Sequence, residues 1–93
     1  MPELHFSIEW PDGTTETCYS PSTIVRDHFA NFTSYGMAEF LARSRAALTA
    51  ASERVRERYG APCSLALGQL ARIEAAASRF SAESVVVFKS FKE

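Results

Sequence analysis

One segment, Met37–Tyr59, constrains the fold of this chain most, because its apolar residues recur every three or four positions. This spacing places them on one face of an α-helix. The face comprises Met37, Phe40, Leu41, Ser44, Ala47, Leu48, Ala51, Val55 and Tyr59. Charged residues occupy many of the intervening positions and indicate a water-exposed face. We therefore expect a long amphipathic helix, against which the rest of the chain packs.

The N-terminal residues predict a β-hairpin. Leu4, Phe6, Ile8 and Trp10 alternate with more polar residues, as in a half-buried strand. Pro11-Asp12-Gly13 suits a three-residue loop in which Gly13 adopts the left-handed conformation. This loop sets a register in which Trp10 faces Thr14, Ile8 faces Glu16, and Phe6 faces Cys18. A tighter loop centred on Asp12-Gly13 would place Tyr19 beside Phe6 instead.

Three further elements follow from the pattern. Ser20 and Pro21 suit the start of a short helix, whose apolar face comprises Ile24, Val25, His28 and Phe29. Residues 30–36 are expected to form a loop. A last helix begins near Cys63 and presents Ala66, Leu70, Ile73, Ala77 and Phe80. Gly68 in its interior disfavours the helix, which suggests a close contact with another helix there.

Val85 to Phe91 is rich in β-branched and aromatic residues and predicts a final strand that pairs with the first. The element order is then β-β-α-α-α-β. The simplest arrangement is an α+β fold, with a three-stranded antiparallel sheet packed on one face by helices. A chain of 93 residues is expected to form a single domain, 1–93.

Composition narrows the classes of function. The net charge of -1 does not favour binding to nucleic acid or to an anionic membrane. The sequence contains no apolar run of the ~20 residues that a membrane span needs, and its first residues do not resemble a signal peptide. Its two cysteines, Cys18 and Cys63, are therefore expected to be reduced thiols in a cytoplasmic protein.

Two cysteines and two arginines are the candidate ligand-binding residues. Cys63 lies near a helix start, where a thiolate is favoured. Arg54 and Arg58 belong to an arginine-rich helix end that suits phosphate or carboxylate binding. The alternatives are that Cys63 and Cys18 are buried core residues and that the arginines form a solvated face. The spacing of cysteines and histidines does not indicate a metal site, no catalytic residues or cofactor motif are identified, and no cofactor is expected.

The final strand also suggests an interface, because it is apolar on both faces. Val85, Val87 and Phe91 alternate with Val86 and Phe88, and the helices can cover only one of these sets. We take Val86 and Phe88 as interface candidates in a homodimer formed at this strand. The alternative is that Phe32 and Tyr35 from the preceding loop cover the exposed set.

Five short motifs, in this order along the chain, resemble one small bacterial family of nitrogen-starvation response proteins. They are Trp10-Pro11-Asp12-Gly13, Cys18-Tyr19-Ser20-Pro21-Ser22, Ser52-Glu53-Arg54-Val55, Tyr59-Gly60 and Cys63-Ser64. The resemblance implies a role in nitrogen metabolism or its stress response. It also suggests, as partners, enzymes of the nitrilase-type gene cluster beside which such proteins are encoded. It supplies no catalytic residues.

Two functions are compatible with these observations. The first is a non-catalytic accessory or protein-interaction module, and a flat apolar patch continuous with the sheet would favour it. The second is a small-ligand-binding protein or thiol enzyme that uses Cys63 or Cys18 with a helix arginine. A deep pocket containing both residue types would favour that function.

Overall fold

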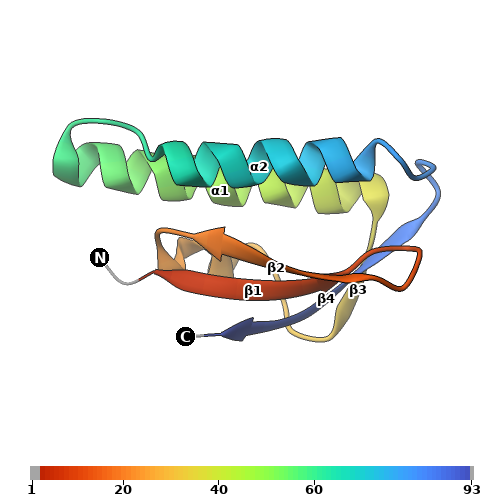
Figure 1. Ribbon diagram of the computed structural model, residues 1–93. Helices are drawn as coiled ribbons and strands as arrows, with labels where there is room; N and C mark the ends of the chain where they lie inside the picture. Colours follow the sequence, from red (N-terminus) through yellow and green to blue (C-terminus); the bar gives the residue numbers. More distant parts are fainter. Residues whose placement is uncertain (1–2, 93) are drawn as a thin grey trace.

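The structure, a computed structural model, describes residues 3–92. It is an α+β fold in which a four-stranded antiparallel sheet has the order β2-β1-β4-β3. The strands are β1 (Leu4–Glu9), β2 (Thr15–Ser20), β3 (Thr33–Gly36) and β4 (Val85–Lys92). Two helices, α1 (Met37–Tyr59) and α2 (Ser64–Ala77), lie side by side on one face of the sheet (Figure 1). In residues 3–92, no helix covers the opposite face, which we call the outer face.

The predicted hairpin register is confirmed. Phe6 pairs with Cys18 and Ile8 pairs with Glu16. The Trp10 N–H donates to the Thr14 carbonyl at 2.8 Å, and Gly13 adopts a φ of 87° in the loop. The side chain of Trp10 also donates through Nε1 to Glu16 Oε1 at 2.8 Å. The proline-containing loop therefore determines which residues of both strands face the helices.

The long helix has the predicted bounds. Gly60 follows α1 with a φ of 87°, and its N–H donates to the Arg56 carbonyl at 2.8 Å, so the helix ends in a left-handed glycine cap. The predicted short helix is instead a 3-10 helix, η1 (Thr23–Asp27). The predicted number of three α-helices was therefore wrong. The element closes with the His28 N–H, which donates to the Val25 carbonyl three residues earlier at 3.1 Å, as is typical of short 3-10 segments.

The predicted loop at residues 30–36 contains a strand that the sequence pattern did not reveal. β3 pairs with β4 from Thr33↔Phe88 to Gly36↔Val85. β4 consequently lies between β1 and β3, and the outer strands of the sheet are β2 and β3. The prediction of three strands was therefore wrong, whereas the predicted pairing of the final strand with the first is confirmed.

A bulge in β4 changes which of its residues face the helices. Ser7 pairs with Ser90 whereas Ile8 pairs with Phe88, so Lys89 is an extra residue between them. The bulge places Phe91 opposite Phe6, with its ring 4.9 Å from that of Phe88. Phe91 therefore packs against the core and does not join Val85 and Val87 on the outer face.

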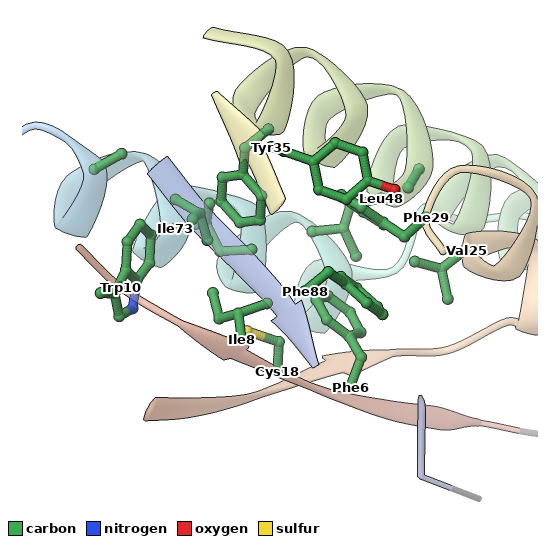
Figure 2. Packing of buried hydrophobic residues seen from close by; sticks show 14 of the residues in the cluster. Phe6, Ile8, Trp10, Cys18, Val25, Phe29, Tyr35, Leu48, Ile73 and Phe88 are labelled. Atoms are coloured by element: carbon green, nitrogen blue, oxygen red, sulfur yellow. The ribbon is translucent and has the colours of Figure 1, made fainter. Parts of the chain in front are cut away.

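Aromatic rings form the centre of the core. Phe29 stacks on Phe88 with ring centroids 4.7 Å apart, and Phe6 stacks on Phe88 at 5.6 Å (Figure 2). Tyr35 is also buried, and its ring packs edge-on against Phe29 at 5.6 Å. Tyr35 therefore does not cover the outer face, as the alternative interpretation of the loop had suggested.

Candidate functional site

The outer face carries an apolar patch where β4 meets β3. Val86 and Phe88 point into the core and are fully buried, so Val85 and Val87 face outward. Their partners in β3 are small, because Val85 pairs with Gly36 and Val87 pairs with Ser34. Beside these small partners Val85 is 47% exposed and Val87 is partly buried.

The assignment of Val86 and Phe88 as interface residues was therefore wrong. Both side chains have no exposed surface within a single chain, because the helices cover that side of the sheet. The outward set of β4 is the other one, reduced to Val85 and Val87 by the bulge that turns Phe91 inward.

Phe32 extends this surface to the edge of the sheet. It directly precedes β3, its N–H donates to the Lys89 carbonyl at 2.9 Å, and its side chain is 78% exposed. Its φ of 54° is left-handed, a conformation that is costly for a residue other than glycine, particularly a bulky one. We call Phe32, Ser34, Gly36, Val85 and Val87 together the β3 margin.

A charged pair lies at the inner boundary of this margin. Lys89 Nζ lies 3.4 Å from Glu9 Oε1, and both side chains are partly exposed. Glu9 pairs directly with Val87 across β1 and β4. An apolar surface with a polar rim on one side is typical of protein-interaction sites.

The opposite edge of the sheet is protected differently. The Tyr19 N–H in β2 points away from β1 and donates to Gln69 Oε1 of α2 at 3.0 Å. Gln69 is buried, so α2 covers part of this edge with a side chain. The β3 edge is consequently the more accessible of the two for pairing with another strand.

Cys63 lies in a shallow groove at the end where α1 turns into α2. The groove has a volume of about 430 Å³ and is lined by Glu3, Tyr19, Pro21, Val55, Tyr59 and Cys63. Cys63 is the N-cap residue of α2, and its N–H donates to Ser52 Oγ at 3.0 Å. Burial, together with the nearby Cys63 and Glu3, raises the pKa of the Tyr19 hydroxyl.

Arg54 and Arg58 lie in a separate groove. It has a volume of about 630 Å³ and is lined by Ile24, Ala50, Glu53, Arg54, Glu57 and Arg58. Two glutamates share it with the two arginines, which weakens the attraction of this surface for an anion. Among the described residues, the lining of this groove contains no cysteine and the lining of the Cys63 groove contains no arginine.

Cys18 is fully buried beneath the helices, on the core face of β2 (Figure 2). Burial, and to a smaller extent the charge of Glu16, raises the pKa of the Cys18 thiol. A protonated thiol in the core is a poor nucleophile. The two cysteines and two arginines thus occupy three different environments, and the structure does not bring them together.

Within residues 3–92, neither helix is both long and apolar enough to cross a membrane. No group of three or more His, Cys, Asp or Glu residues in the same range is arranged to hold a metal ion.

The fold and the surface define a two-layer α+β protein whose sheet has one uncovered face with an apolar margin. This chain belongs to the family of the nitrogen starvation-induced protein NitG, whose family model matches residues 5–91. The comparison confirms the family resemblance that its short motifs indicate. Searches of curated proteins and of solved structures gave no match.

Proposed function

We propose that this protein is a non-catalytic accessory module of the bacterial nitrogen-starvation response, and that it binds another protein through the outer face of its sheet. The observation that carries the proposal is the β3 margin, where the exposed Val85 and the partly buried Val87 face outward beside small residues. The enzymes of a nitrilase-type cluster are the candidate partners.

The separation of the thiols from the arginines supports this function over a thiol enzyme. The groove that contains Cys63 and the groove that contains Arg54 and Arg58 have no lining residue in common. Attack by a thiolate on a bound carboxylate or phosphate ligand would require both residue types at one position. The apolar margin, in contrast, is continuous with the sheet.

The test is affinity capture from nitrogen-starved cells, followed by reconstitution with the purified partner. Val87→Lys places a charge on the margin without entering the core. Thr17→Lys is the control, because Thr17 is an exposed residue of β2, the outer strand at the opposite edge of the sheet from β3. We expect the native protein and Thr17→Lys to retain the same partner, and Val87→Lys to lose at least nine-tenths of it.

Circular dichroism must first show that both variants are folded. Retention of the same partners by Val87→Lys would refute the assignment of the margin. Turnover of a nitrile or amide substrate by the purified native protein that is abolished by Cys63→Ser would refute the non-catalytic role.

A further inference from the structure

The free edge of β3 has an identifiable hydrogen-bonding pattern. Beyond Gly36, the Met37 N–H donates to the Ser84 carbonyl at 3.0 Å and continues the ladder between β3 and β4. Backbone groups in an antiparallel pair alternate between the partner strand and the opposite side. Thr33 and Tyr35 therefore direct their N–H and C=O groups toward β4, whereas Ser34 and Gly36 direct theirs away from it. These groups form an edge that can accept another strand.

β3 is short, with four residues, but it lacks the other features that usually prevent strand pairing. Besides shortness, proteins protect outer strands with charged residues, proline, bulges or a covering helix. β3 contains neither a charged residue nor a proline, and its four residues pair with β4 without a register shift. The contrast with β2, where Gln69 caps the Tyr19 N–H, indicates that the β3 edge is open for a partner.

The residues at the edge are complementary to a second copy of themselves. In a two-fold antiparallel pair with Ser34 opposite Ser34 of the second copy, Phe32, which directly precedes β3, comes close to Gly36 of the second copy, and the same contact recurs on the other side of the axis. The Phe32 N–H already donates to the Lys89 carbonyl, so Phe32 contributes its side chain and not its N–H to the pairing. Phe32 is an exposed aromatic residue. A Cβ added to Gly36 would meet no described atom within 4 Å beyond its chain neighbours. A cross-strand ring that covers a glycine stabilises a sheet.

We propose that a second copy of this chain binds to the β3 edge through antiparallel pairing of Ser34 with Ser34 of the second copy. The pairing joins the two four-stranded sheets into one. It covers the exposed Phe32 and places the two Val85–Val87 patches on one continuous outer face, with the two β3 strands between them. This inference goes beyond the proposed function, because a partner could bind the margin of a monomer.

The first experiment is sedimentation velocity of the native protein, Ser34→Lys and Thr17→Lys, from micromolar to hundreds of micromolar. Ser34→Lys places two like charges directly opposite one another across the axis, which is destabilising. Thr17→Lys makes the same change on the other outer strand. We expect the native protein and Thr17→Lys to be dimers and Ser34→Lys to be a folded monomer, with a dissociation constant at least a hundred-fold weaker.

The second experiment tests the register of the strand pairing between the two copies, and it uses a variant that leaves the dimer intact. Ser34→Cys in a Cys63→Ser background is oxidised with glutathione disulfide. Directly opposed residues in an antiparallel pair have Cα atoms about 5.5 Å or less apart, which suits a disulfide. We expect a disulfide-crosslinked dimer of Ser34→Cys at concentrations at which Thr17→Cys, in the same background, forms no crosslink.

Each outcome decides the proposal. A native protein that is monomeric at hundreds of micromolar, a Ser34→Lys variant that remains dimeric, or equal crosslinking of Ser34→Cys and Thr17→Cys would overturn it. A monomer that still captures a partner through Val87 would overturn this inference and leave the proposed function intact. A dimer that captures no partner would support this inference and refute the proposed function.

Discussion

The substitution Leu48→Ala tests whether the apolar face of α1 forms the core. Leu48 is fully buried in the middle of the helix. The change removes three carbon atoms, which at about 0.8 kcal/mol per buried CH₂ amounts to roughly 2.4 kcal/mol. The cavity that remains adds a further cost, because stacked rings in the same cluster restrict collapse. We expect a total loss of about 2–5 kcal/mol in the free energy of unfolding.

Urea denaturation followed by circular dichroism measures this loss. With a slope of about 1 kcal/mol per molar, the midpoint should fall by at least ~2 M urea. Leu65→Ala is the matched control, because Leu65 lies on α2 and is 64% exposed. Its cost should be within about 0.5 kcal/mol. Equal midpoints for the parent and Leu48→Ala, or equal losses for the two variants, would show that the assignment of the buried face is wrong.

Three further results are expected. Gly68→Ala should stabilise the protein by up to about 1 kcal/mol, because its new Cβ would meet only Arg72 Nη1, at 3.9 Å; a lower denaturation midpoint would contradict this. In the folded protein a thiol reagent should modify Cys63 and spare Cys18, whereas both should react after unfolding without reductant, since both are free thiols in the structure; rapid modification of Cys18 in the folded protein would contradict its burial. Finally, burial raises the pKa of the Cys18 thiol, so above pH ~8.5 the unfolded chain releases a proton that the folded chain retains. The free energy of unfolding should therefore fall as the pH rises above that value, and a decline of equal steepness in Cys18→Ala would refute the cause.

The sequence predicted the elements whose signals are local and repeated. The periodicity of Met37–Tyr59 identified α1 and both of its ends, because Gly36 and Gly60 flank a long amphipathic pattern. The alternation around Pro11-Asp12-Gly13 likewise predicted the hairpin and its register. In both cases residues close together in the chain determine the structure, so no knowledge of tertiary contacts was needed.

Elements that depend on distant partners could not be predicted in the same way. β3 has only four residues, and two of them, Ser34 and Gly36, are not typical of strands. It exists because β4, about 50 residues later, supplies its hydrogen bonds. The expected close contact of Gly68 with another helix was also wrong, since no atom of α1 would lie within 4 Å of a Cβ at that position.

In the candidate site, one extra residue in β4 changes which apolar side chains face outward. Strict alternation along β4 assigns Phe91 to the same face as Val85 and Val87, which would produce a large apolar surface that needs a partner. The bulge at Lys89 shifts Phe91 to the core, where it pairs with Phe6. The outward apolar surface of β4 is then limited to two valines, which is small for a specific interface. The accessible edge has meanwhile moved to β3, where backbone groups and an exposed aromatic residue add to those valines. An interaction at this surface should therefore depend on strand pairing at Ser34 as well as on burial of Val85 and Val87, and substitutions at both positions are needed to separate the two contributions.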